Sequence, residues 1–245
     1  MTNILNQTLA QIVTANHQTA TVFEKYHLDF CCKGKRPLQQ ACSEKNLPVE
    51  QVIKELTETI SNTVNREGAL LNYITLTQLC DYIVATHHAF VKQNAPQISI
   101  YLDKIATKHS DRHPELIEIA NLFTQLKEEM ESHMYKEENI LFPRIKELEK
   151  HSVEFPLAIP ASVYLEAPIS EMEHEHDGAG SLLEQLREKT NNYTPPADAC
   201  TTYRVAFASL QAFEIDLHQH VHMENNILFP RAIEAANKLN RQTSN

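Results

Sequence analysis

The stretch HMYKEENILFPR at residues 133–144 recurs as HVHMENNILFPR at residues 220–231. Upstream of each copy, at nearly the same distance, lies a further histidine, His87 before the first copy and His176 before the second. An internal repeat of this kind predicts a duplicated structural unit. Two helical hairpins, duplicated in this way, make a four-helix bundle.

The histidine and the glutamate of each copy are four residues apart, His133 with Glu137 and His220 with Glu224. On an α-helix these positions share one face and lie about 6 Å apart along the axis, so both side chains can reach one pair of ions. Each pair offers an imidazole nitrogen to one ion and a carboxylate long enough to bridge two. A single such pair is a weak signal, but its duplication with matching upstream histidines predicts a metal site.

The predicted donors are four imidazoles and two carboxylates, a nitrogen and oxygen set that suits iron or manganese better than the sulfur-rich sets of structural zinc or copper(I) sites. We expect two iron ions, bridged by Glu137, Glu224 and a solvent-derived oxygen. With two histidines for each iron, each ion keeps an open position where a small molecule can bind.

Two competing metal motifs fail at single positions. A ferritin-like di-iron site needs Glu-x-x-His on two helices, and here only Glu173 with His176 matches. A His-Glu-x-x-His zinc protease needs a second histidine at the position that Gly178 occupies after His174. No hydrolase or transferase motif is found either.

The composition favours an all-α protein. Only 4 glycines and 11 prolines are present, and the stretches between them are rich in helix-forming residues. Pro143 and Pro230 are expected to kink or interrupt their helices just beyond each repeated glutamate. Residues 151–168 and 191–196 are expected to connect helices. The predicted bundle helices cover roughly residues 74–94, 114–148, 169–190 and 199–239.

Residues 1–68 carry amphipathic patterns of their own and predict a small helical N-terminal domain before the bundle domain at residues 69–245. This segment contains the adjacent thiols Cys31 and Cys32, followed by Lys33, Lys35 and Arg36, whose charge is expected to favour thiolate. The sequence is compatible with a redox role for this pair and equally with two free thiols that are only structural. Cys42 is a further candidate near the pair, and Cys80 and Cys200 are expected to pack as small hydrophobic residues.

Charge and cysteine content exclude several classes of partner. The net charge is −10, with 22 basic against 32 acidic residues, which disfavours nucleic acid and anionic lipid. The sequence has no apolar run of membrane-spanning length. Five cysteines without a repeating framework fit reduced thiols, so we expect a cytoplasmic protein.

Several motifs stand out along the chain: the two repeat copies, MEHEHD at residues 172–177, NNYTPP at residues 191–196 and DFCCKGKRPL at residues 29–38. Through these motifs the chain resembles the hemerythrin-like family, and more closely its di-iron proteins for repair of iron centres, the YtfE/ScdA type. The resemblance covers nearly the whole sequence. A dioxygen carrier is disfavoured, because Met172 and Gly180 stand where a further histidine would be needed.

The resemblance implies a cytoplasmic protein that restores iron–sulfur clusters damaged by nitric oxide or peroxide, by iron donation or by removal of nitric oxide. Its partners are then damaged iron–sulfur proteins and a small ligand at the iron, such as nitric oxide. A homodimer is compatible with the resemblance, which does not decide the oligomeric state. The alternative is an enzyme that reduces nitric oxide or peroxide directly at the di-iron centre. The resemblance makes Glu137 and Glu224 the bridges and makes the terminal ligands His87, His133, His176 and His220.

Overall fold

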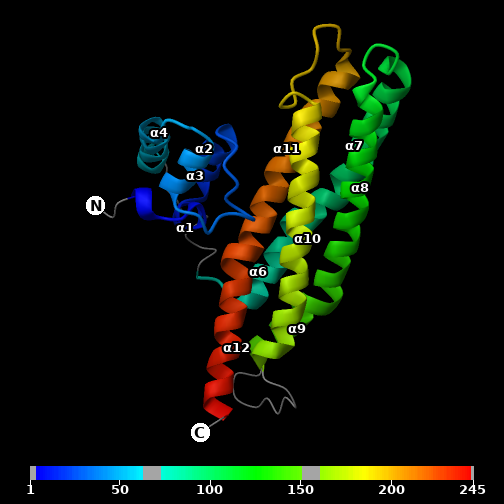
Figure 1. Cartoon of the computed structure of the whole chain (residues 1–245). Helices are drawn as coiled ribbons and strands as arrows, with labels where there is room; N and C mark the ends of the chain where they lie inside the picture. The colour runs from blue at the N-terminus through cyan, green and yellow to red at the C-terminus, as the bar shows by residue number, and fades with distance from the viewer. Residues whose placement is uncertain (1–3, 63–72, 151–160, 244–245) are drawn as a thin grey trace.

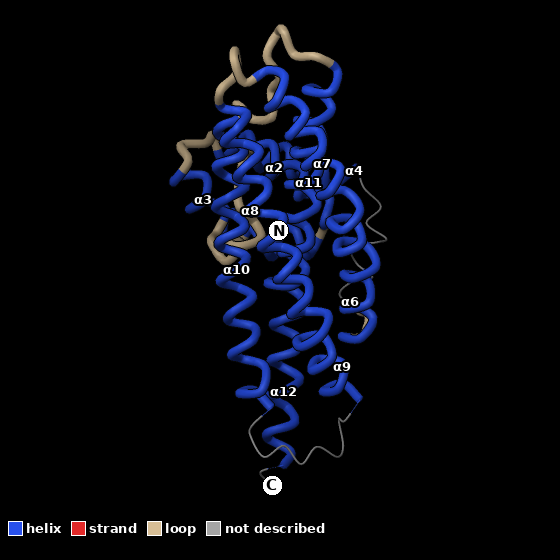
Figure 2. Tube along the Cα trace, turned by 90° about the vertical axis from the view of Figure 1, so that its right-hand side faces the viewer, coloured by secondary structure: helices blue, strands red, loops and turns tan. Residues whose placement is uncertain are grey.

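The computed structural model describes residues 4–62, 73–150 and 161–243. Over these residues the chain is helical, with no strand and a single isolated bridge between Thr8 and Pro37 (Figure 2). The all-α prediction is confirmed. None of the described helices is both long enough and apolar enough to cross a membrane.

Four long helical rods form a bundle, and three of them contain a π-helical turn (Figure 1). In chain order the segments are α6 (Leu76–Ile83), η3 (Val84–His88) and α7 (Ala89–His109); α8 (Glu115–Lys136), η4 (Glu137–Leu141) and α9 (Phe142–Lys150); α10 (Ala161–Lys189); α11 (Thr201–Met223), η5 (Glu224–Leu228) and α12 (Phe229–Thr243). Helix α7 packs against α8 and α11, while α10 packs against α8 and α12. The predicted four-helix bundle is therefore present.

The two repeat prolines explain two of the π-helical turns. Pro143 and Pro230 are the second residues of α9 and α12, directly after η4 and η5. Proline has no N–H for the carbonyl four residues earlier and crowds it, so a wider turn before the ring relieves both conflicts. The predicted interruption of these helices takes this form.

One predicted helix end and one predicted connection are wrong. The first bundle helix, predicted to end near residue 94, continues through Pro96 to His109. The expected connection at residues 151–168 is shorter, because α10 begins at Ala161 and includes Pro168. The sequence interpretation treated proline as a break. Burial of an apolar face can outweigh one lost backbone hydrogen bond, and Ala95 and Ile98 beside Pro96 are buried.

The N-terminal segment lies beside α11 in Figure 1. Apolar residues of this segment and of the adjoining half of the bundle form one continuous hydrophobic cluster, so the two parts pack together. The predicted division between residues 68 and 69 falls outside the described residues. The segment contains η1 (Ile4–Asn6), α1 (Leu9–Ala15), η2 (His17–Thr19), α2 (Ala20–Lys25), α3 (Leu38–Glu44) and α4 (Val49–Asn62).

A second hydrophobic cluster fills the other end of the bundle, between α6, α9, α12 and the start of α10. Along each rod the side chains change from one cluster to the other close to the histidines and glutamates of the repeat. On α10, for example, Met172 belongs to the second cluster and Ala179 to the first. A buried polar layer therefore separates two apolar regions, and it contains the candidate site.

Candidate metal centre

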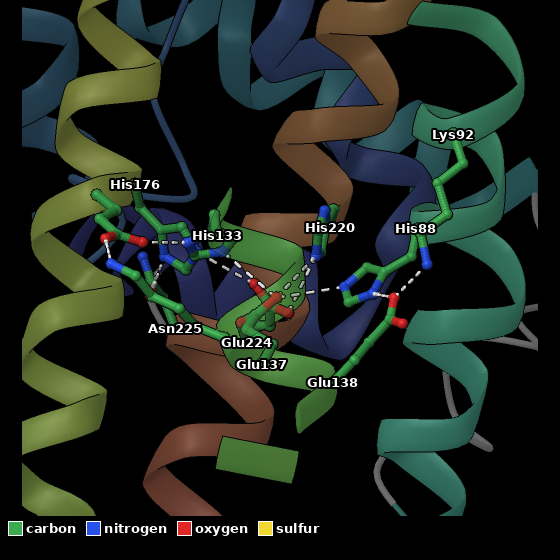
Figure 3. A network of polar contacts seen from close by, with 11 residues as sticks. His88, Lys92, His133, Glu137, Glu138, His176, His220, Glu224 and Asn225 are labelled. Carbon is green, nitrogen blue, oxygen red and sulfur yellow. Dashed lines mark hydrogen bonds and ion pairs between the residues drawn. The ribbon is translucent and has the colours of Figure 1, made fainter. Parts of the chain in front are cut away.

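Six buried side chains from all four rods converge in the polar layer (Figure 3). The structure groups their donor atoms into two sets that share both glutamates, with the atoms of each set within 4.8 Å of one another. One set, here called position A, adds two histidines from η3 and α11, and the other, position B, adds two from α8 and α10. Position A contains His88, Glu137, His220 and Glu224, and position B contains His133, Glu137, His176 and Glu224.

The distances between donors match the edges of a metal coordination shell. The Nε2 atoms of His133 and His176 lie 3.1 Å apart, and Nε2 of His220 lies 3.0 Å from Oε1 of Glu224. Nε2 of His88 lies 3.3 Å from Oε2 of Glu137. Donors about 2.1 Å from one ion, at right angles to each other, are about 3 Å apart. The cluster thus has the spacing of a site built around cations.

The opposite ring nitrogen of three of these histidines is held by a hydrogen bond. Nδ1 of His133 donates to Glu175 at 2.8 Å, and Nδ1 of His88 donates to Glu138 at 2.7 Å. Nδ1 of His176 meets the side-chain oxygen of Asn225, also at 2.8 Å. A carboxylate can only accept, so the proton of the neutral ring sits on Nδ1 and the Nε2 lone pair faces the cluster.

Several inward-facing atoms have no hydrogen-bond partner among the described residues. They include Nε2 of His88, both carboxylate oxygens of Glu137, and Oε2 of Glu224. The nearest groups to these carboxylates are the imidazoles of the cluster, with His133 3.3 Å from Glu137 and His176 3.1 Å from Glu224. Burying a carboxylate costs several kcal/mol, which a neighbouring cation or proton offsets. The residues present therefore fit a metal-binding site.

The pKa values of the metal-free cluster favour ionised carboxylates beside the imidazoles. Burial raises the pKa of Glu224, but His220 and His176 outweigh this effect and hold that pKa well below its usual value. Burial lowers the pKa of His133, yet Glu137 and Glu175 raise it to about 10. The metal-free chain thus keeps its carboxylates ionised and retains a proton near the place where an ion would bind.

The structure places His88, and not the expected His87, in this cluster. Nδ1 of His87 instead lies 3.0 Å from Oδ1 of Asp216, and its ring stacks on His220 with centroids 5.6 Å apart. Both histidines are buried on η3, so burial does not distinguish them. Adjacent residues point about 100° apart, and the wide turn of η3 sets which of them faces Glu137.

The residue after each repeated glutamate holds a histidine, a role that the sequence interpretation missed. Glu138 follows Glu137 and holds His88, while Asn225 follows Glu224 and holds His176. Their equivalent places in the two copies could have revealed them. Glu175 and Asp216 lie outside the repeat. Glu175 belongs to the MEHEHD motif, although no role was predicted for it, and no motif of the sequence includes Asp216.

Two phenylalanines of the repeat pack against histidine rings of the cluster. Phe142 stacks on His88 with an interplanar angle of 18°, and Phe229 stacks on His176 with an angle of 4°. These rings orient the imidazoles and exclude water from them. Ile140 is 43% exposed, whereas its counterpart Ile227 is buried.

The thiols Cys31 and Cys32 lie against the same centre. Their sulfurs are 3.8 Å apart, and Sγ of Cys32 contacts the carbonyl oxygen of His176 at 3.6 Å. The hydrogen bond with Cys32, together with burial, holds the pKa of Cys31 well above its usual value, so the expected thiolate is not favoured there. Cys80 is buried as expected, but Cys200 is exposed.

Comparison with known proteins identifies both parts of the chain. Residues 79–232 match the family described as hemerythrin HHE cation binding domain, and residues 5–60 match a domain of unknown function named ScdA_N. Proteins named iron-sulfur cluster repair protein YtfE, from Enterobacter sp. (strain 638) and Escherichia coli O157:H7, are each 34% identical over 228 residues. The alignments cover 93% of this chain and 97% of each relative.

The chain belongs to the YtfE family of iron–sulfur cluster repair proteins. A further YtfE protein, from Citrobacter koseri, is 33% identical over the same share of both chains. The matched cation binding domain contains all six residues of positions A and B, from His88 to Glu224. The matched N-terminal domain of the family contains Cys31 and Cys32.

Proposed function

We propose that the cluster binds two iron ions. His88 and His220 would be the terminal ligands at position A, His133 and His176 those at position B, and Glu137 and Glu224 would bridge the two. The observation that carries this proposal is the pair of overlapping donor sets, which share both glutamates and no histidine. Two ions close together are the arrangement for which two shared carboxylates are suited.

Bound iron would supply redox chemistry and coordination positions for a small ligand such as nitric oxide. The chain itself supplies the orientation of the imidazoles, through Glu138, Glu175 and Asn225. It also supplies a dry surrounding, because Phe142 and Phe229 cover two of the rings. Outer hydrogen bonds of this kind typically change metal affinity 10–100-fold.

We propose that the protein returns iron to iron–sulfur clusters damaged by nitrosative or oxidative stress, and that it acts in the cytoplasm. The names of its relatives support the repair of iron–sulfur clusters. Three of the proposed ligands, His88, Glu137 and Glu224, lie on π-helical turns. Such turns are rare and are frequently found at functional sites, which supports a role for this cluster in the function.

Iron transfer to an apo-cluster protein tests this function. The purified chain, loaded with isotopically enriched ferrous iron, is mixed anaerobically with an apo iron–sulfur enzyme, sulfide and a reductant. We expect the enriched iron to appear in the enzyme and its activity to return, whereas Glu224→Ala should give neither result. Rapid steady-state consumption of nitric oxide without iron transfer would move the assignment to a nitric oxide reductase.

A further inference from the structure

The loop between α2 and α3 brings two thiols to one place. Cys31 and Cys32 are neighbours in sequence, and neighbouring side chains of an extended chain point in opposite directions. Here Oδ1 of Asp29 accepts the backbone N–H groups of Cys31, Cys32 and Lys33, at 3.2, 2.9 and 3.3 Å. These bonds curl the backbone, so both sulfurs lie on the same side.

The distance between the sulfurs fits a shared metal ion. They are 3.8 Å apart, whereas a disulfide needs about 2.05 Å. Two thiolates about 2.3 Å from one tetrahedral ion are about 3.8 Å apart. Oδ1 of Asp29 lies 3.3 Å from Sγ of Cys31, so a carboxylate charge stands beside the pair.

The pair of thiols is open on one side to a cavity. Cys31 is buried, while Cys32 is partly exposed, and both line a cavity of about 530 Å³. The cavity is lined by four basic side chains, Lys33, Arg36, Lys45 and Arg187, and by four acidic ones, Glu24, Asp29, Asp177 and Glu184, so its charges balance. A structural zinc site is closed by four protein ligands, whereas this pair leaves room for donors from a second molecule.

The loop is also joined to the helices that hold position B. Sγ of Cys32 lies 3.6 Å from the carbonyl oxygen of His176, and the side-chain amide of Asn226 donates to the carbonyl oxygen of Cys31 at 3.1 Å. Asn226 follows Asn225, which holds His176. The thiol of Cys32 therefore contacts the backbone of His176, a residue whose side chain is a proposed iron ligand.

We propose that Cys31 and Cys32 form a second metal site, which binds one thiophilic divalent cation through two thiolates and leaves its other positions open to the cavity. On binding, two S–H bonds break, two metal–sulfur bonds form, and two protons leave to solvent. Asp29 is a positioning residue for both sulfurs. The role of this site rests on the proposed iron donation. A ferrous ion passes through it from the bundle to an acceptor protein.

Cobalt(II) titration of the full metal-free chain tests the site. Cobalt bound to thiolate has an intense near-ultraviolet charge-transfer band, which the nitrogen and oxygen donors of positions A and B do not produce. In the native chain we expect a band whose final intensity corresponds to one thiolate-bound cobalt per chain, while positions A and B take up further cobalt without adding to it. The band should be lost in Cys31→Ser and in Cys32→Ser. Cys42→Ser and Cys200→Ser, which change thiols outside the pair, should keep it.

The same titration separates this site from the di-iron centre. Glu224→Ala should lose iron from the bundle and still give the cobalt–thiolate band. A native chain without the band, or a band retained in both Cys31→Ser and Cys32→Ser, would overturn the second site. Circular dichroism shows whether each variant is folded, and Cys32→Ser changes the more exposed thiol, so it is the variant expected to leave the fold intact.

The role in transfer has its own readout. Cys32→Ser should hold as much iron in the bundle as the native chain, yet it should deliver that iron to an apo iron–sulfur enzyme at least tenfold more slowly. Cys42→Ser should deliver it at the native rate. Equal delivery rates for Cys32→Ser and the native chain would refute the transfer role.

Discussion

Positions A and B have the same types of donor, two histidines and the two shared glutamates. Their histidines, however, are not equally well oriented by outer hydrogen bonds. At position B both histidines have outer partners, Glu175 for His133 and Asn225 for His176. At position A only His88 has one, Glu138, while Nδ1 of His220 has no partner among the described residues. Outer partners fix the orientation of a metal-binding imidazole, so the duplicated sequence yields two unequal half-sites.

The environments of the two positions add to this difference. The ring of His220 stacks on His87, whose Nε2 is buried and has no hydrogen-bond partner in the part of the chain that the structure describes. Near position B, the loop of Cys31 and Cys32 covers the backbone of His176. We therefore expect position B to retain its ion more firmly and position A to give up its ion first.

The strongest test of the comparison removes what the two positions share. Glu137→Ala or Glu224→Ala should reduce iron from about two ions per chain to nearly none, because each glutamate belongs to both donor sets. Elemental analysis of the purified variants measures this loss. One full equivalent of iron retained in each variant would show that the positions bind independently, and full iron in both, or stoichiometric zinc instead, would refute the di-iron proposal.

The next test separates the positions through the adjacent histidines of η3. His88→Ala should lose about one iron, from position A, while His87→Ala should retain both, because only His88 faces Glu137. Iron content and Mössbauer spectra distinguish the outcomes. Iron loss in His87→Ala with none in His88→Ala would restore the sequence-based choice of His87.

A matched pair of asparagines tests how position B is held. Asn225→Ala should weaken iron binding at position B by roughly 10–100-fold, since His176 loses its outer partner. Asn226→Ala should retain iron but lower the free energy of unfolding by about 1 kcal/mol, through its lost bond to Cys31. Competition with a ferrous chelator measures the first effect and denaturant unfolding the second. Equal iron affinities in the two variants would contradict the assigned roles.

The smallest expected effect is the pH dependence of binding at position B. The pKa of His133 is about 10 in the metal-free chain, so its ring is protonated at neutral pH and must lose that proton to bind iron. Affinity should therefore rise with pH, by about tenfold per unit for this one proton. Anaerobic calorimetry of His88→Ala, in buffers of different ionisation enthalpy, counts the protons released. Iron uptake without proton release would contradict the prediction.

The sequence by itself determined the bundle and five of the six residues in the cluster. A histidine and a glutamate four residues apart share one face of any α-helix, so His133 with Glu137 and His220 with Glu224 follow from local geometry. The duplication then pointed to His176 and to a histidine within the first bundle helix. These conclusions depend only on the spacing of residues along the chain and on the internal repeat, and both can be read directly from the sequence.

Only the tertiary structure decided which of His87 and His88 faces the glutamates. The choice depends on one widened turn and on what lies opposite it, Glu137 for one ring and Asp216 for the other. The contact of Cys32 with His176 joins residues 144 positions apart in sequence. Such contacts are set by how helices dock rather than by local periodicity, and that physical difference separates what the sequence could predict from what required the fold.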